Sequence, residues 1–502
     1  MAVLDRLSLL SDAVLGHILS FLPATDAARA AVLSRRWRHV FVAVHTLSFD
    51  DRDRRDDDDD DRIFPAWPFE RPPLADLVTA ALLARHPAPL RELRVAFRSL
   101  RGLTHDAVDQ WLGDGGLHLL RLDLRVLGDE LSEEDLYAAA ADDDKEEVPR
   151  ATMIPVPRRL FTCCAALRSL RLGPCSLDLM PPAIHLPSLD TLLLTRAAGA
   201  VQRLVDACPR LADLTLEDCV EVTSLRLHDN NNKRLRALAL RGCHGLTTVT
   251  MDELRVFEYR GGVPGPDFFA AAPVTITSCT LDLCHDEEQQ HSSSEHHHHN
   301  LRGFLQLFAG GVTRLHLKSA RLGLGSHSSP HPVFFPECTR LRHLELTGIA
   351  SDKDATILPS VSRILERTPS LETLSLFFLP DPDPALEEET APSNVHDDNE
   401  KAAVYDHEDV LSLHWLKYDR RLAVPEGGDE VRCLRERVRE INLVHYQGGR
   451  SQRALPNLLL RHALVLDRLC CAVARGPLWM QCGLAEEIRR WAANKSTKMM
   501  FV

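Results

Sequence analysis

The sequence predicts an α/β protein with a small helical domain first, an irregular horseshoe-shaped solenoid of strand repeats next, and an α+β cap at the C-terminus. Three observations support this fold class. Apolar residues recur at helical spacing within residues 9–44. A unit of the form L-x-x-L-x-L then repeats between Leu90 and Leu376, often at the intervals of a solenoid. The apolar pattern changes again from Cys433 onward.

Composition indicates a large globular protein. A chain of 502 residues can hold several domains, and 44% of its residues are hydrophobic. No apolar run reaches membrane-spanning length, and the start, MAVLDRLSLLSD, lacks the apolar stretch of a signal peptide. The 13 cysteines are odd in number and scattered, which does not indicate a disulfide framework. We therefore expect an intracellular protein, cytoplasmic and/or nuclear, with no membrane partner.

The net charge of −13 is concentrated in acidic segments, which are residues 51–62, 129–147, 285–300 and 381–400. Their composition is that of solvated loops, and the rest of the chain is mildly basic. No basic stripe with interleaved aromatic residues occurs, so a nucleic-acid partner is not expected.

Residues 9–49 read as three short amphipathic helices. Ser11 can cap the first, Pro23 ends it, and Thr25 and Asp26 can cap the second. The third carries Trp37, Val40, Phe41 and Val44 on one face. Such short helices bury little surface among themselves, so many of their apolar side chains should face something else.

This stretch resembles an F-box, through the elements LLSD (9–12), ILSFLP (18–23), DA (26–27), VLSRRWR (32–38) and LSFD (47–50). The form VLSRRWR is similar to the plant subfamily. Leu10 stands where proline is common, and Phe41 where tryptophan is common. The resemblance implies docking to a Skp-type adaptor and, through it, to a cullin ubiquitin ligase.

Helix-in-groove packing would carry that contact. The expected contact residues are Leu9, Leu10, Val14, Ile18, Leu19, Leu22, Pro23, Leu33 and Trp37. Core packing is the alternative for each of them, and Trp37 is the residue for which it weighs most. Arg35 and Arg36 are expected to be solvated.

The repeated unit is typical of a leucine-rich-repeat array, in which each repeat gives one short parallel strand. Asparagine does not recur at the usual ladder position, and Cys175, Cys219 and Cys243 fall near it. Their spacing fits the repeat period better than a metal site. Helices are expected at 74–85, 197–211 and 358–368, and extra convex strands at 222–227 and 246–251. The units begin at Leu90, Leu117, Leu167, Leu189, Leu211, Leu235, Leu254, Val312, Leu341 and Leu371.

In each such strand the residue between the last two apolar positions points to the concave face. These residues share no chemistry, so the target cannot be predicted from them. They form the candidate target face: Arg171, Leu193, Thr215, Ala239, Glu258, His316, Glu345 and Ser375.

The C-terminal region reads as strand, helix, strand and helix, and resembles the FBD region of plant F-box proteins, with Leu434, Ile441, Leu458 to Leu460, Ala463 and Leu466 at its apolar positions. Such a region would cap the open end of the solenoid. The expected boundaries are 1–50 for the F-box, 51–75 for an acidic and proline-rich linker, 76–380 for the repeats with insertions at 129–150 and 285–300, 381–405 for an acidic loop, and 406–502 for the last repeat and cap.

The favoured function is the substrate-recognition subunit of a cullin-based, SCF-type ubiquitin ligase, with the F-box on the adaptor and the repeats on a target protein. The alternative is a protein-binding scaffold outside any ligase. Catalysis is not expected, since G-x-S-x-G, G-x-x-x-x-G-K and H-E-x-x-H are all absent. No cofactor is expected. The histidine run at 296–299 could bind a metal weakly, but its surroundings read as a loop.

Overall fold

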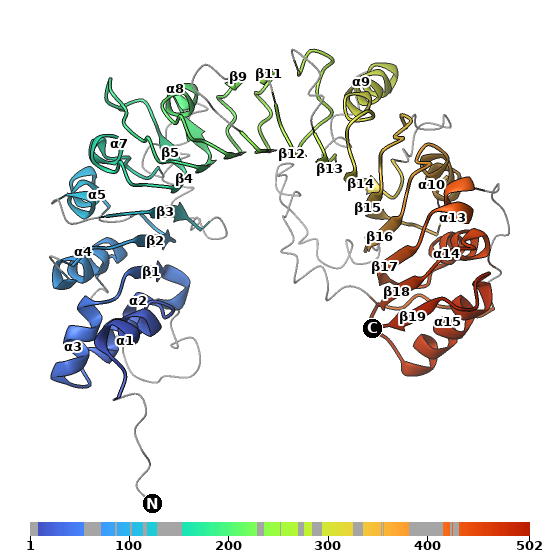
Figure 1. Cartoon of the computed structure of the whole chain (residues 1–502), viewed down its shortest axis with the longest axis horizontal. Coiled ribbons are helices and arrows are strands. Elements are labelled where there is room, and N and C mark those ends of the chain that lie inside the picture. The colour runs from blue at the N-terminus through green and yellow to red at the C-terminus, as the bar shows by residue number, and fades with distance from the viewer. Residues whose placement is uncertain are drawn as a thin grey trace, which may run out of the picture. The chain divides into compact units, whose positions relative to one another are not determined.

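The computed structural model describes residues 9–54, 72–85, 88–100, 103–113, 118–127, 153–227, 235–251, 253–269, 276–283, 294–324, 335–352, 354, 356–380, 415–421, 424 and 431–502. The chain divides into two compact units, Met1–Asp252 and Glu253–Val502. Each unit contains parallel strands joined by helices or by further short strands (Figure 1). The predicted class, a helical F-box followed by a parallel-sheet solenoid, is confirmed.

The F-box helices are α1 (Asp12–Leu19), α2 (Ala24–Ala30) and α3 (Arg35–Val42). Ser11 caps α1 as expected, since its side chain accepts a hydrogen bond from the Val14 amide at 3.4 Å. Ser34 caps α3 in the same way. The expected caps of α2 are wrong, because Pro23 occupies the cap position and Thr25 and Asp26 lie inside the helix.

The main sheet of unit 1 is parallel, and its neighbouring strands follow chain order. The strands are β1 (Thr46–Asp50), β2 (Glu92–Phe97), β3 (Arg121–Val126), β4 (Ser169–Gly173), β6 (Thr191–Thr195), β8 (Asp213–Glu217) and β10 (Ala237–Arg241). The short helix η1 (Asp51–Arg54) follows β1, and the α-helices between the strands are α4 (Leu74–Arg85), α5 (His105–Leu112), α7 (Arg158–Cys163) and α8 (Val201–Asp206).

Short parallel pairs replace helices in several repeats of unit 1. One pair is β5 (Cys175–Ser176) with β7 (Ala197–Ala198), and the other is β9 (Ser224–Leu227) with β11 (Thr248–Met251). The extra strands expected near 222–227 and 246–251 are therefore confirmed. We call the face of each main sheet that is turned away from its helices the open face.

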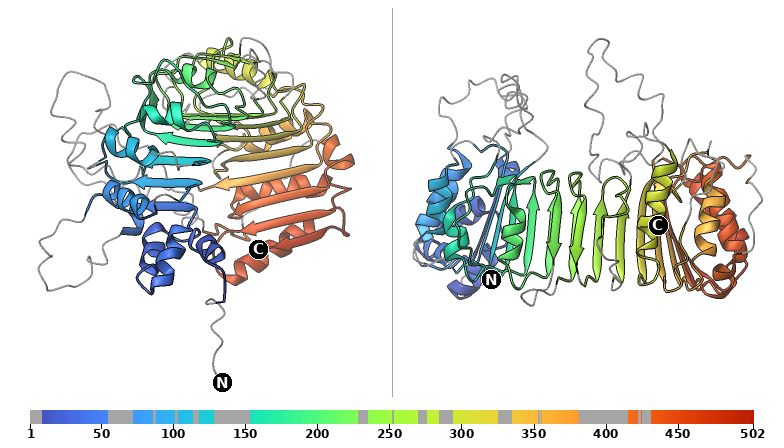
Figure 2. Two further views of the ribbon diagram at one scale, coloured as in Figure 1. Left: turned by 60° about the vertical axis from the view of Figure 1, so that its left-hand side comes forward. Right: turned by 90° about the horizontal axis from the view of Figure 1, so that it is seen from above.

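Unit 2 is built in the same way (Figure 2). Its strands are β12 (Val256–Arg260), β13 (Ser278–Asp282), β14 (Arg314–Arg321), β15 (His343–Ile349), β16 (Thr373–Leu379), β17 (Glu440–Tyr446), β18 (Arg468–Val473) and β19 (Lys498–Phe501). Its helices are α9 (Ser294–Gln306), α10 (Ile357–Glu366), α13 (Arg432–Glu436), α14 (Arg450–His462) and α15 (Leu478–Trp491).

The apolar positions of the repeat form the core in both units. Leu170, Leu192, Leu214 and Leu238 lie in register on successive strands and are buried. Each such leucine contributes about 1.5–3 kcal/mol when it leaves water. The cysteines near the ladder position are buried as well, and the Cys219 and Cys243 thiols approach the Leu194 and Leu216 carbonyl oxygens at 3.6 and 3.5 Å. These thiols bridge adjacent repeats.

The first repeat strand lies inside the region expected to be F-box alone. β1 pairs in parallel with β2, and Val44, Leu47 and Phe49 are buried like the leucines of later repeats. The F-box expected at 1–50 therefore includes the first strand of the sheet. Most of the linker expected at 51–75 falls on residues 55–71, which lie outside the described part.

The sequence pattern gave the wrong position for one strand, β3, and missed another, β13. The buried leucines of this repeat are Leu119, just before β3, and Leu122 and Leu124 in it, two positions beyond the expected unit. The expected first residue, Leu117, is outside the described part. β13 was missed because its central apolar residue is Cys279. The end of one expected insertion and the identity of the last strand also differ from the expectation. The insertion expected at 285–300 ends earlier, since α9 starts at Ser294, and β19 follows the strand expected to be last.

The C-terminal region has the expected strand–helix–strand order. β17 pairs with β16, and β18 and β19 continue the same parallel sheet. Residues 440–501 therefore extend the sheet of unit 2, and β19 is its end strand.

Candidate functional site

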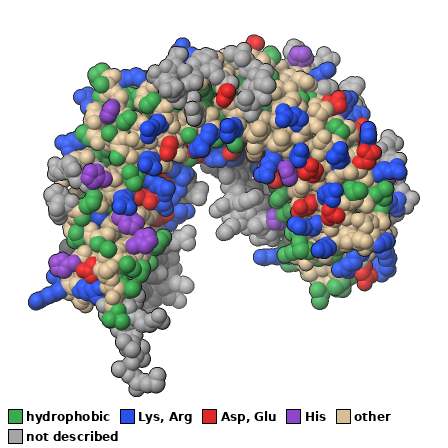
Figure 3. All heavy atoms as spheres, viewed as in Figure 1, with side chains coloured by type: hydrophobic (Ala, Val, Ile, Leu, Met, Phe, Trp, Pro, Cys, Tyr) green, Lys and Arg blue, Asp and Glu red, His purple; other side chains and the backbone are tan. Residues whose placement is uncertain are grey.

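The F-box region exposes a group of large apolar side chains, two on α1 and the others in the segments before and between the helices. We call this group the apolar F-box face, and Figure 3 shows apolar side chains on the surface of this region. Their exposed fractions run from 41% to 80%, far above the core residues beneath them. Exposed apolar groups on a surface are typical of interaction sites. Its members are Leu9, Val14, Ile18, Phe21, Leu22, Val32 and Leu33.

The expected adaptor contacts fall into three groups in the structure. Leu9, Val14, Ile18, Leu22 and Leu33 are exposed, while Leu10, Pro23 and Trp37 are half-buried. Leu19 is 4% exposed and packs inside the unit, so it is not available to a partner here. The sequence reasoning missed Phe21 and Val32, which belong to the elements ILSFLP and VLSRRWR that carried the resemblance.

Specific contacts hold α1 in place. The Arg36 Nε donates to Asp12 Oδ1 at 2.9 Å, and its guanidinium also reaches the Leu10 carbonyl oxygen. The expectation that Arg36 is merely solvated is therefore wrong. Gly16 faces the backbone of Ala43, where an added Cβ would lie 2.8 Å from the nearest atoms. Glycine at this position lets α1 pass close to the end of α3.

A buried arginine joins the F-box to the first repeat. Arg85, at the end of α4, is 2% exposed, and its guanidinium donates to the Val44 carbonyl oxygen and, at 3.4 Å, to that of Val42. Both carbonyls lie at the end of α3, where helix carbonyls need donors. Burial lowers the pKa of Arg85 to about 10, so the side chain stays charged at neutral pH. The apolar F-box face and the first strands are thus fixed to each other.

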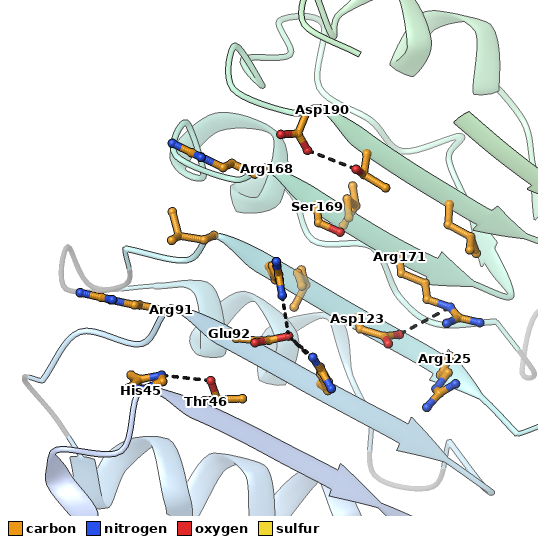
Figure 4. A pocket seen from close by; sticks show the side chains of 17 residues that line it. His45, Thr46, Arg91, Glu92, Asp123, Arg125, Arg168, Ser169, Arg171 and Asp190 are labelled. Atoms are coloured by element: carbon orange, nitrogen blue, oxygen red, sulfur yellow. Dashed lines mark hydrogen bonds and ion pairs between the residues drawn. The ribbon is translucent and has the colours of Figure 1, made fainter. Parts of the chain in front are cut away.

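The open face of unit 1 contains a groove of about 840 Å³ across β1, β2, β3, β4 and β6 (Figure 4). We call it the arginine groove, because six arginines line it together with Glu92, Asp123 and Asp190. Figure 3 shows basic and acidic side chains gathered on this side of the unit. With His45 neutral, the lining carries a net charge of +3. The arginines are Arg91, Arg94, Arg121, Arg125, Arg168 and Arg171.

Only part of this positive charge is neutralised inside the groove. Arg94 Nε donates to Glu92 Oε1 at 2.7 Å, and Arg121 lies 4.0 Å from the same carboxylate. Arg171 lies 3.9 Å from Asp123, whose pKa burial raises. Within the described residues, Arg91 and Arg168 form no ion pair with a carboxylate.

All residues of the expected target face lie half-buried on main strands. Arg171 and Leu193 line the arginine groove, and Thr215 and Ala239 continue their row on β8 and β10. In unit 2, Glu258, His316, Glu345 and Ser375 occupy the equivalent row on their sheet. The row also contains Arg94 and Asp123, which the expected face lacked. For Asp123 the reason is that the predicted register of β3 was two residues too early.

Other kinds of candidate site have less support in the structure. No group of His, Cys, Asp and Glu suited to a metal ion occurs in the part of the chain that the structure describes. The histidine run lies on α9, contrary to the expectation of a loop. Among the described helices, none is both long and apolar enough to span a bilayer. Burial raises the pKa of the Cys175 thiol to about 12, so this cysteine is a packing residue.

Comparison with known proteins decides the identity of the N-terminal region. The family profile of the F-box domain matches residues 7–45, the segment that forms α1, α2 and α3. This is an F-box protein. Its homologues are of the leucine-rich-repeat and FBD types.

This F-box protein is similar to several proteins of Arabidopsis thaliana. An F-box/LRR-repeat protein is 30% identical over 225 residues, which is 42% of this chain and 36% of that protein. An F-box/FBD/LRR-repeat protein is 28% identical over 297 residues, covering 55% and 57%. A putative F-box/FBD/LRR-repeat protein is 25% identical over 396 residues, covering 75% and 79%. The chain spans between 36% and 51% of the first three relatives it matches.

Proposed function

We propose that this protein is the substrate-recognition subunit of a cullin-based, SCF-type ubiquitin ligase. The apolar F-box face docks a Skp-type adaptor, and the open faces of the repeats bind a target protein. The observation that carries the proposal is the exposure of the F-box apolar side chains, combined with the F-box match to residues 7–45. Proteins of the F-box/LRR family are typically non-catalytic adaptors, so we propose no chemistry in this chain. The gain is proximity between target and ligase.

The test is co-purification of the full chain with a plant Skp-type adaptor. The wild-type chain should recover the adaptor in equal amounts. Ile18→Asp and Leu22→Asp should each abolish recovery, because each places a charge in a desolvated apolar interface. Both side chains are exposed, 43% and 41%, so thermal unfolding of the variants should match the wild type.

Leu83→Asp is the matched control. Leu83 is 60% exposed, lies on α4 outside the F-box, and receives the same change of side chain. Its variant should keep the adaptor. Unchanged recovery by Ile18→Asp and Leu22→Asp would remove the docking assignment. A folded wild type that recovers no adaptor would favour the alternative, a scaffold that uses its repeats alone.

A further inference from the structure

The arginine groove differs from a neutral target surface in having an excess of positive charge. Two of its three carboxylates, Glu92 and Asp123, already lie near guanidiniums, and Asp190 accepts a hydrogen bond from Thr191. Arg91 and Arg168 form no ion pair with a carboxylate among the described residues. We propose that this groove binds a phosphorylated segment of the target protein. The inference rests on the proposed function, since it names the class of target, but the binding can be measured without the ligase.

These two arginines stand at one end of the groove. Arg121 pairs in register with both Glu92 and Ser169, so Arg91 and Arg168, one residue earlier, lie at the same level two strands apart. Two strand spacings amount to about 10 Å. Figure 4 shows both side chains extending from that end of the strands. Long side chains at this separation can converge on one phosphate group, with planar donors suited to its oxygens.

A third arginine, Arg125, marks the other end, near Asp123. Arg125 lies four residues beyond Arg121 on β3, about 13 Å along an extended strand. Figure 4 shows Arg125 on the same side as Arg171 and Asp123. A ligand that reaches both ends is therefore an extended segment of several residues. The volume of about 840 Å³ is likewise far too large for a lone phosphate ion.

The built-in carboxylates favour phosphate over a ligand carboxylate. Glu92 and Asp123 already offer single negative charges to the inner guanidiniums. A phosphate carries about −1.5 to −2 charges and three strong acceptors, so it can bridge arginines that a carboxylate satisfies only singly. Leu120 and Leu193 add half-buried apolar surface for the carbon atoms of a peptide.

The same lining disfavours nucleic acid. Among the described residues around the groove there is no Phe, Tyr or Trp. Single-stranded nucleic acids are held largely by stacking of their bases on such rings. A phosphorylated protein segment fits the groove better.

The experiment measures fluorescence polarisation of a labelled peptide pool with a central phosphoserine and degenerate flanks, added to the full chain. Matched pools carry serine or glutamate at the centre. The phosphoserine pool should bind at least about tenfold more tightly than either. Equal affinity for the serine or glutamate pool would overturn the proposal. So would equal binding of inorganic pyrophosphate, or tighter binding of a mixed-sequence RNA oligonucleotide.

Variants locate the site. Arg91→Glu with Arg168→Glu should weaken binding at least about tenfold, because two donors become repulsive charges. The milder pair Arg91→Gln and Arg168→Gln keeps the proposal testable if the first variant folds poorly. Arg210→Glu, an exposed arginine of the same unit that does not line the groove, is the matched control and should bind like the wild type. Unchanged binding by both groove variants would contradict the assignment.

Adaptor recovery measured on the same samples separates the two proposals. Recovery of the adaptor without phosphopeptide binding would overturn the groove proposal and leave the ligase role intact. Phosphopeptide binding without the adaptor would support the groove and overturn the ligase role.

Discussion

The apolar F-box face and the arginine groove lie in the same compact unit but differ in the chemistry of their side chains. The first is a set of exposed aliphatic and aromatic side chains on α1 and in the segments beside the F-box helices, and the second is a set of partly paired charges on and beside strands. Apolar area favours a stable partner, whose removal would leave that area in water. Charged groups favour selectivity and fast exchange. The difference suggests a lasting partner on the helices and a changing one on the strands.

The largest expected effect concerns which F-box side chains face inward. Leu19→Ala should lower the free energy of unfolding by about 3 kcal/mol, because it empties a buried site. Ile18→Ala, next to it but exposed, should change stability by less than about 0.5 kcal/mol while weakening adaptor binding about tenfold. Urea unfolding and adaptor titration measure both. Equal stability loss in the two variants would show that the exposed face is wrongly assigned.

Salt should separate the two surfaces. Raising ionic strength from about 50 mM to about 400 mM shortens the distance over which charges act, so phosphopeptide binding to the groove should weaken at least about tenfold. Adaptor affinity should change less than about twofold, since apolar burial carries it. Polarisation and adaptor titration in the same buffers check this contrast. An adaptor affinity that falls as steeply as peptide binding would mean that charge dominates both surfaces.

The smallest expected effect lies where the two surfaces meet. His17 Nδ1 of α1 and His45 Nε2, which lines the groove, are 2.9 Å apart, an arrangement that needs a neutral ring. Burial lowers the pKa of His45 below 6.5, His17, Arg91 and Arg85 lower it further, and Glu92 opposes them. A lowered folded-state pKa gives stability that is present above about pH 6.5 and is lost as the pH falls below it.

Acidification from about pH 7.5 to about pH 5.5 should therefore lower Tm slightly. His45→Gln should flatten this response, whereas His105→Gln, at an exposed position on α5, should not. Thermal unfolding monitored by circular dichroism provides the measurement. An identical pH response in wild type and His45→Gln would place the sensitive group elsewhere.

Much of the fold could be predicted from the sequence because buried leucine repeats at a fixed spacing. The exceptions have physical reasons. Residues 117 to 124 contain leucines in two phases that both satisfy L-x-x-L-x-L, so the register of β3 was ambiguous. β13 uses Ile276 and Cys279 where leucine is usual, and burial accepts these side chains equally well.

The candidate surfaces were less predictable. Helical spacing cannot distinguish Ile18 from Leu19, because α1 has apolar residues on neighbouring positions and only packing against α3 decides which turns inward. The arginine groove was missed for another reason. Arg91 and Arg168 precede their strands, outside the one position per repeat that the sequence reasoning followed. Their proximity depends on the register between strands, which local pattern does not give.

Arg85 has a consequence for geometry. Because it fastens the end of α3 to the first repeat, and β1 runs directly from the F-box into the sheet, unit 1 has no pivot between its docking helices and its groove. In the proposed complex the unit would hold the groove at a fixed distance from the adaptor. A phosphorylated segment held in the groove would place only those target lysines at the right reach within range of the ligase. The choice of modified lysine would then be set by the length of target chain between phosphate and lysine.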